Sequence, residues 1–162
     1  MSGLATLWGL GARVPAPGSI ASALAVAAAV LLHGLGNFPL MAAATVAVTA
    51  LAVPAIRAAL AGGTGDPPEV VIDEVAGQWL VMCAPSAGFW MAGLDPWQFP
   101  WPGWLSAFLL FRLFDIAKPW PVSRAERLPG AAGVLADDLV AGALAGASVI
   151  ALAALWHGAV AG

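Results

Sequence analysis

The sequence predicts an all-α integral membrane protein, a polytopic bundle of about five transmembrane helices. Of the 162 residues, 61% are hydrophobic and 9% are charged, whereas soluble domains carry roughly 25% charged residues. The charges are also unevenly spread, because four long stretches contain no Asp, Glu, Lys or Arg: 14–56, 75–94, 96–111 and 139–162. A transmembrane helix needs about 20 mostly apolar residues, and the first stretch is long enough for two.

A turn divides that first stretch. The segment "HGLGNFP" at 33–39 is rich in turn residues and predicts a helical hairpin. We therefore expect spans at about 18–34, 39–60, 74–92, 102–117 and 135–157. The linkers are short, so residues 1–162 should form a single domain. We expect no removable signal peptide, because the first residues lack a basic region followed by a small-residue cleavage site.

The basic residues all fall on one side of this arrangement, and the positive-inside rule makes that side cytoplasmic. They are Arg13, Arg57, Arg112, Lys118, Arg124 and Arg127. All acids except Asp95 share that side, namely Asp66, Glu69, Asp73, Glu74, Asp115, Glu126, Asp137 and Asp138. The net charge of −3 and the lack of a basic stripe exclude a typical nucleic-acid partner.

Two acid pairs, Asp73–Glu74 and Asp137–Asp138, stand at the predicted starts of apolar spans. One interpretation is helix capping, in which an acid accepts hydrogen bonds from free backbone amides. Capping explains one acid per helix and explains two adjacent acids poorly, since like charges repel. The other interpretation is a divalent-cation site, because carboxylate oxygens with room for water and phosphate suit Mg²⁺.

Small residues follow each acid pair. Ala76 and Gly77 come after the first, and Gly142-x-x-x-Gly146 comes after the second. Small side chains let membrane helices approach closely. We therefore expect these two helices to cross in contact, which would bring the two acid pairs together.

The stretch "FRLFDIAKPWPVSR" at 111–124 ends the fourth span. Asp115 and Lys118 are three residues apart and share a helix face. The simpler interpretation is a snorkelling Arg112 with Lys118 as a topology signal. Alternatively, Arg112, Lys118 and Arg124 hold an anion while Asp115 joins the metal site.

The loop "GLGARVPAPGSIAS" at 9–22 places Gly18 and Ser19 where the first span starts. It is either a helix-start loop or a phosphate site, because free amides at a helix N-terminus bind phosphate. It is not a Walker loop, since it lacks Gly-Lys-Ser/Thr.

Together, "PAPGS", "VIDEVAGQW", "FRLFDIAKPWP" and "GVLADDLVAG" resemble the signatures of the phosphatidylglycerophosphatase A family over about residues 9–146. The resemblance implies a multi-pass enzyme of the bacterial inner membrane with its active site facing the cytoplasm. Such an enzyme hydrolyses phosphatidylglycerophosphate to phosphatidylglycerol and phosphate with Mg²⁺, in glycerophospholipid synthesis. Its substrate is therefore a membrane lipid.

We assign roles to these residues as a hypothesis. We expect the metal ligands to be Asp73, Glu74, Asp137 and Asp138, and Asp115 completes the catalytic acids as a further candidate ligand. The phosphate-binding residues are Arg112, Lys118 and Arg124, with the Ser19 hydroxyl and the Gly18 amide. We favour direct attack by water, with an aspartyl-phosphate as the open alternative.

Three other functions remain open from the sequence. They are a small transporter with an acidic mouth, a lipid phosphotransferase and an assembly subunit without chemistry. The apolar middles of the spans disfavour a transport path, and the phosphotransferase pattern of spaced acids is missing. The oligomeric state is not determined by the sequence.

Overall fold

The computed structural model describes residues 2–61, 69–98 and 101–161, and none of these residues forms a strand. The predicted all-α class is therefore confirmed for this part of the chain. Asp66 lies outside the described residues. The elements are α1 (Ser2–Ala5), α2 (Pro17–Leu60), α3 (Ile72–Met91), the 3₁₀ helix η1 (Pro96–Gln98), α4 (Trp101–Ala117), α5 (Val122–Ala125) and α6 (Ala131–Ala161).

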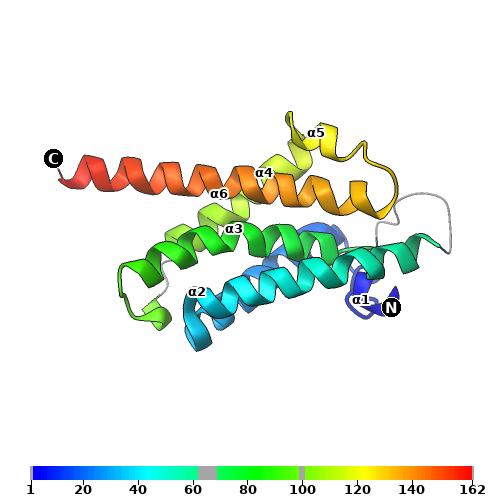
Figure 1. The fold of residues 1–162 in the computed structure, drawn as a ribbon, viewed down its shortest axis with the longest axis horizontal. Helices are drawn as coiled ribbons and strands as arrows, with labels where there is room; N and C mark the ends of the chain where they lie inside the picture. Colours follow the sequence, from blue (N-terminus) through cyan, green and yellow to red (C-terminus); the bar gives the residue numbers. More distant parts are fainter. Residues whose placement is uncertain (1, 62–68, 99–100, 162) are drawn as a thin grey trace.

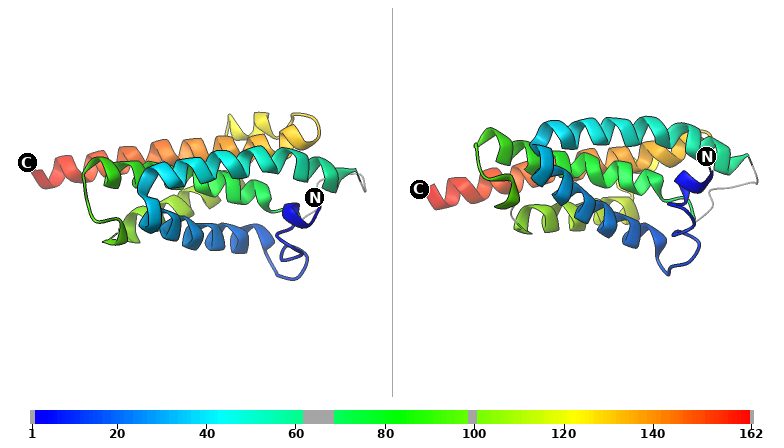
Figure 2. Two further views of the ribbon diagram at one scale, coloured as in Figure 1. Left: turned by 60° about the horizontal axis from the view of Figure 1, so that its bottom comes forward. Right: turned by 90° about the horizontal axis from the view of Figure 1, so that it is seen from below.

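The predicted hairpin is a sharp bend within α2. Gly36 (φ −153°, ψ 18°) and Asn37 (φ 55°, ψ −159°) leave the helical conformation, and the helix continues on both sides of them. Figure 2 shows the two halves of α2 running back along one another from this bend. The turn predicted at 33–39 is thus confirmed, and it is narrower than expected because only two residues depart from helical geometry.

The two halves of α2 pack with α3, α4 and α6 into an elongated bundle (Figure 1). The starts of α2, α3 and α6 and the end of α4 lie at one end of this bundle, which we call the acidic end because it carries Glu74, Asp115 and Asp138. Further from the acidic end, Phe111 of α4 is fully buried in one apolar cluster with Val81 and Met82 of α3. This apolar core fixes how the helices present their side chains at the acidic end.

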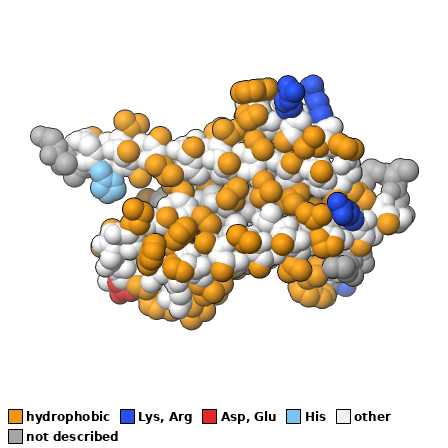
Figure 3. Space-filling model, viewed as in Figure 1, with side chains coloured by type: hydrophobic (Ala, Val, Ile, Leu, Met, Phe, Trp, Pro, Cys, Tyr) orange, Lys and Arg blue, Asp and Glu red, His pale blue; other side chains and the backbone are white. Residues whose placement is uncertain are grey.

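The outward faces of the bundle are strongly apolar. Figure 3 shows hydrophobic side chains across the face in view, with basic side chains toward the end where α5 lies. Among the described helices, two are long and apolar enough to cross a membrane, at Pro17–Leu60 and Ala131–Ala159. The five predicted spans are not shown in full, since α4 has 17 residues and α3 carries two acids in its first turn.

The start of the last helix differs from the prediction of 135. The helix α6 begins at Ala131, so Asp137 and Asp138 lie in its second turn instead of at its start. Capping of the helix start is therefore the wrong explanation for this pair. Asp73 and Glu74 do lie in the first turn of α3, yet the capping residue Val71 has no side-chain hydrogen bond to the helix.

An apolar cavity of about 460 Å³ lies between the two halves of α2 and the start of α3. Its lining includes Ala25, Ala28, Val48 and Val75, and it contains none of the acids of the acidic end. It is therefore separate from the candidate site described next.

Candidate metal and phosphate site

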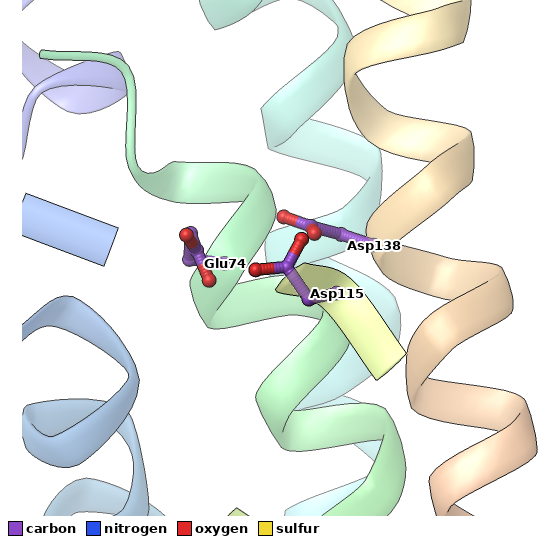
Figure 4. Close-up of side chains that lie close together, drawn as sticks. All are labelled: Glu74, Asp115 and Asp138. Atoms are coloured by element: carbon purple, nitrogen blue, oxygen red, sulfur yellow. The ribbon is translucent and has the colours of Figure 1, made fainter. Parts of the chain in front are cut away.

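Three carboxylates converge at the acidic end. One oxygen from each of Glu74, Asp115 and Asp138 lies within 4.8 Å of the other two. The side chains come from α3, α4 and α6 and point toward one another (Figure 4). Asp138 is 4% exposed, and the side chains of Glu74 and Asp115 are 14% and 13% exposed. The prediction that the two acid pairs meet is confirmed for Glu74 and Asp138.

Glycines allow this meeting. A Cβ added to Gly142 of α6 would lie 2.5 Å from the backbone oxygen of Gly77 on α3. A Cβ added to Gly77 would lie 2.6 Å from the backbone oxygen of Asp138. The two backbones are thus in direct contact one turn from the acids, as the small residues predicted. Gly146 is not part of this contact, because the nearest atom to a Cβ there would be 3.8 Å away.

The carboxylate of Glu74 is held by groups from α2 and α4. The Ser22 hydroxyl donates a hydrogen bond to Glu74 Oε2 at 3.1 Å, and Arg112 Nη1 donates to the same oxygen at 2.5 Å. A Cβ added to Gly18 would come within 2.0 Å of Glu74 Oε1. Gly18 therefore lets Glu74 lie against the first turn of α2, whose free amides favour negative charge.

Arg112 also pairs with Asp115, with 2.8 Å between Nη1 and Asp115 Oδ2. The Arg112 guanidinium thus forms ion pairs with two of the three clustered carboxylates. Asp138 has no ion pair within the described part of the chain. Three carboxylates this close repel one another unless they bind protons or a cation. Clustered carboxylate oxygens are the donor set that Mg²⁺ prefers, so Glu74, Asp115 and Asp138 fit the metal implied by the sequence.

The first acid of each pair behaves differently from the second. Asp73 Oδ1 accepts a hydrogen bond from the backbone amide of Glu74, and Asp137 Oδ1 accepts one from the amide of Asp138, both at 3.1 Å. Both first acids are buried, each 7% exposed. Asp73 and Asp137, predicted as metal ligands, therefore flank the three-carboxylate group, and Asp115, predicted as an additional ligand, lies within it.

Lys118 links α4 to α6. Its ammonium donates to Asp137 Oδ2 at 2.7 Å and to Glu126 Oε1 at 2.6 Å. The backbone of Lys118 is left-handed (φ 43°) and Pro119 follows, so α4 ends here and the side chain turns toward α6. Burial lowers the pKa of Lys118, but these two carboxylates outweigh burial and raise the pKa above its ordinary value.

The other predicted phosphate-binding residues are spread out. Arg112 lies within the acid group, and Gly18 touches it. Ser19 is half-buried in the first turn of α2. Arg124 is exposed on α5 and forms no ion pair with any described acid. The structure thus brings together Gly18, Arg112 and the acids, and Arg124 has no ion pair with these acids.

Sequence reasoning missed two polar residues of this region. Ser22 is fully buried and binds Glu74. Gln78 is fully buried, and neither atom of its amide has a hydrogen-bond partner in the described structure. Both stand four residues after a predicted site residue, Gly18 or Glu74, which places them on the same helix face. That spacing was the available signal.

Comparison with known proteins relates the chain to lipid phosphatases. The family model of phosphatidylglycerophosphatase A matches residues 3–153. A Bacteroides thetaiotaomicron protein, named as a candidate phosphatidylinositol-3-phosphatase, is 39% identical over 79 residues, 48% of this chain and 43% of that protein. Phosphatidylglycerophosphatase A of Escherichia coli K12 is 33% identical over 84 residues, covering 51% and 42% of the two chains.

The same protein of Haemophilus influenzae Rd is 36% identical over 81 residues, 49% of this chain and 42% of that relative. The chain thus spans less than half the length of the curated relatives it matches. No solved structure matches it.

Proposed function

Because the chain belongs to the phosphatidylglycerophosphatase A family, we propose that it hydrolyses phosphatidylglycerophosphate to phosphatidylglycerol and phosphate, with Mg²⁺, in bacterial glycerophospholipid synthesis. The observation that carries this proposal is the meeting of Glu74, Asp115 and Asp138 from three helices beside Arg112. A phosphomonoester lipid needs a polar site for its headgroup at the edge of an apolar bundle. The acidic end supplies that combination.

The three carboxylates would hold the metal. When bound, Mg²⁺ would polarise the phosphoryl oxygens and make an attacking water more acidic. It also reconciles an acidic site with an anionic substrate, since a bound cation inverts the local charge. Asp73 and Asp137 would orient Glu74 and Asp138 through the backbone hydrogen bonds that each first acid accepts.

Arg112 would act on the substrate directly. Both of its ion pairs use Nη1, and a guanidinium carries five N–H donors. The remaining donors can bind phosphoryl oxygens and stabilise the charge that develops in the transition state. In the reaction a water oxygen bonds to phosphorus, the bond from phosphorus to the glycerol oxygen breaks, and that oxygen leaves as the protonated alcohol.

We also propose that the five helical segments all cross the bacterial inner membrane, with the acidic end in the cytoplasm. All six basic residues lie on the segments that meet at this end, and Asp95 lies near η1 at the other. The positive-inside rule then gives the orientation. Residues 1–162 would form a single membrane domain, and the lipid substrate would reach the site from the inner leaflet.

The test is phosphate release from phosphatidylglycerophosphate by the purified protein, with Mg²⁺ and with a chelator. We expect release only with Mg²⁺, and a loss of at least about 10²-fold in kcat for Asp138→Asn. The control is Arg57→Gln in the last turn of α2, which should stay within about threefold of wild type, since it removes no group of the site. Wild-type turnover by Asp138→Asn in saturating Mg²⁺ would refute the site.

The likeness to the Bacteroides protein supports a second candidate substrate, an inositol lipid phosphorylated at position 3. The reaction class and the site would be the same. Offering both lipids at equal surface concentration decides between them, because kcat/KM measures the preference directly. We expect the glycerol headgroup to be preferred, since two of the three relatives are phosphatidylglycerophosphatases.

A further inference from the structure

Gln78 is a buried polar residue without a hydrogen-bond partner in the described part of the chain. It is 0% exposed, and both its amide oxygen and its amide nitrogen lack hydrogen bonds among the described residues. Buried polar side chains in natural proteins are almost always paired, and an exception calls for an explanation. A glutamine amide offers both an acceptor and two donors, so a suitable ligand group would itself donate and accept.

The position of Gln78 on α3 relates it to the acid group. Gln78 lies four positions after Glu74, so the two share a helix face and lie about one turn apart, roughly 6 Å along the axis. The residues on either side of Gln78 contact other parts of the bundle. Gly77 contacts α6 and Phe111, and the Trp79 indole donates to the backbone oxygen of Ala25 at 2.9 Å.

A second buried group beside the acids also lacks a partner. Arg112 Nε has no hydrogen-bond acceptor in the part of the chain that the structure describes, although Nη1 of the same guanidinium binds Glu74 and Asp115. A donor and an amide thus both lack partners on the Glu74 side of α3. Unpaired buried donors and acceptors of this kind favour a polar ligand group that would bind beside the carboxylates.

We propose that the Gln78 amide binds the hydroxyl on the carbon next to the phosphorylated carbon of the lipid headgroup. The proposal rests on the proposed function, in which the phosphomonoester lies at Glu74, Asp115 and Asp138. A hydroxyl donates to the amide oxygen and accepts from the amide nitrogen, whereas a phosphoryl oxygen only accepts. Gln78 lies further from the acidic end along α3 than Glu74 does. In the lipid, this hydroxyl lies between the terminal phosphate and the acyl chains, so a phosphate at Glu74 would direct the hydroxyl toward Gln78.

This makes Gln78 a specificity-determining residue. Glycerol phosphate and inositol 3-phosphate headgroups both carry such a hydroxyl, and phosphatidic acid does not. A site built to bind a hydroxyl discriminates strongly against analogues without it, because its buried polar groups are then left unpaired. The chemical feature that Gln78 recognises is therefore a hydroxyl next to the phosphomonoester, in either a glycerol or an inositol headgroup.

The experiment compares wild type, Gln78→Leu and Gln98→Leu, each purified in the same detergent. Gln98 is exposed on η1 at the far end of the bundle and provides the same change as a control. The substrates are phosphatidylglycerophosphate, its analogue with hydrogen in place of that hydroxyl, and phosphatidylinositol 3-phosphate. The readouts are kcat/KM for phosphate release and the midpoint of thermal unfolding.

We expect wild type to prefer the hydroxylated lipid to its deoxy analogue by at least about tenfold. Gln78→Leu should lose that preference, with turnover of the deoxy analogue within about threefold of wild type. Its unfolding midpoint should not fall, because the substitution removes a buried amide without a partner. Gln98→Leu should match wild type throughout. Comparing the loss of kcat/KM for the glycerol lipid and the inositol lipid in Gln78→Leu shows which headgroup depends more on Gln78.

Two results would overturn the proposal. One is a wild-type enzyme that does not discriminate between the hydroxylated and deoxy lipids. The other is a Gln78→Leu variant that melts at lower temperature and loses both substrates equally, which would assign Gln78 a structural role. If wild type releases no phosphate from any lipid, the proposed function fails. In that case, glycerol 3-phosphate and propyl phosphate are added to wild type and to Gln78→Leu, and the shift in unfolding midpoint is measured. A larger shift with glycerol 3-phosphate in wild type only would show that Gln78 binds the hydroxyl.

Discussion

Gly18 shows how one absent side chain shapes the site. It lies in the first turn of α2, and a Cβ there would meet Glu74 Oε1 at 2.0 Å and Glu74 Cδ at 2.9 Å. Glu74 has little freedom to move away, because Ser22 and Arg112 both bind its other oxygen. The carboxylate that these groups hold in place would therefore be displaced by a methyl group.

We predict that Gly18→Ala lowers kcat/KM by about 10²-fold, since a displacement of about 1 Å at a reacting centre has effects of that size. Phosphate release measures it. The control is Gly88→Ala in α3, where a Cβ would meet nothing within 4 Å. Alanine is the better helix former by about 1 kcal/mol, so this control should be active and no less stable. Full activity in Gly18→Ala would show that Glu74 does not need its present position.

Lys118 is predicted to act in stability more than in phosphate binding. Its ammonium binds Asp137, which is 7% exposed. Lys118→Met leaves that carboxylate buried without its cation, and loss of one partner of a buried hydrogen bond costs about 1–3 kcal/mol. Adding Asp137→Asn should recover most of the loss. Thermal unfolding of the two single variants and the double variant measures the coupling, and simple additivity would contradict the link.

The pKa of Lys118 gives this link its pH dependence. The folded pKa is raised above the ordinary value by Asp137 and Glu126, against the opposing effect of burial. A raised lysine pKa means that the stabilisation is complete below the unfolded pKa of about 10.4 and is lost as the pH rises through the folded pKa. We therefore expect the destabilisation by Lys118→Met to be the same at pH 6 and pH 9. A marked fall by pH 9 would contradict the ion pair.

At the scale of the helices, the crossing of α3 and α6 sets the distance between the acids. Gly142 and Gly77 are in backbone contact, and Glu74 and Asp138 lie on the same two helices. Gly142→Ala should push the helices apart, with an overpacking cost of about 1–3 kcal/mol. It should also weaken Mg²⁺-dependent activity.

The matched control is Gly146→Ala, one turn further along α6, where the nearest atom to the new Cβ is 3.8 Å away. That variant should keep its unfolding midpoint and its Mg²⁺ requirement. The measurements are the midpoint of thermal unfolding and the Mg²⁺ concentration giving half-maximal turnover. Equal effects of the two alanines would mean that helix propensity, and not the close crossing, explains them.

The sequence was informative about elements wherever one signal dominated. The uncharged runs located the helices, and Gly36 and Asn37 stood inside the predicted turn. The start of α6 was misplaced by four residues, because the small residues from Ala131 onward carry neither a cap nor a charge. Local pattern gives little guidance where an apolar helix begins among glycine and alanine.

The sequence predicted which charged residues form the site better than it predicted which of them contact one another. The acid pairs and Arg112 were marked by their charge in an apolar chain. The pairing of Lys118 with Asp137 depends on the left-handed backbone at Lys118. Pro119 predicts that the helix ends here, but it does not predict that conformation. Ser22 and Gln78 are uncharged, so the sequence marks them only by their four-residue spacing from Gly18 and Glu74. Their contacts, or the lack of them, are visible only in the structure.

For the whole molecule, the decisive property is which ends of the helices share a side of the membrane. The end of α4 and the starts of α3 and α6 carry the acids and Arg112. The far end carries η1 and Asp95. If the segments cross the bilayer, these two ends face different compartments, and the lipid headgroup is handled on one side only.

Cysteine labelling tests this arrangement, because Cys83 is the only cysteine of the sequence. In a Cys83→Ala background, we place one cysteine at exposed Ala132, at the start of α6, or at exposed Gln98 in η1. A membrane-impermeant maleimide added outside intact spheroplasts should label the Gln98 position and leave the Ala132 position unlabelled until the cells are lysed. The positive-inside rule requires this direction, since the basic residues accompany Ala132. Labelling of both positions from outside would place both ends on one side, and the helices would then lie on the membrane instead of crossing it.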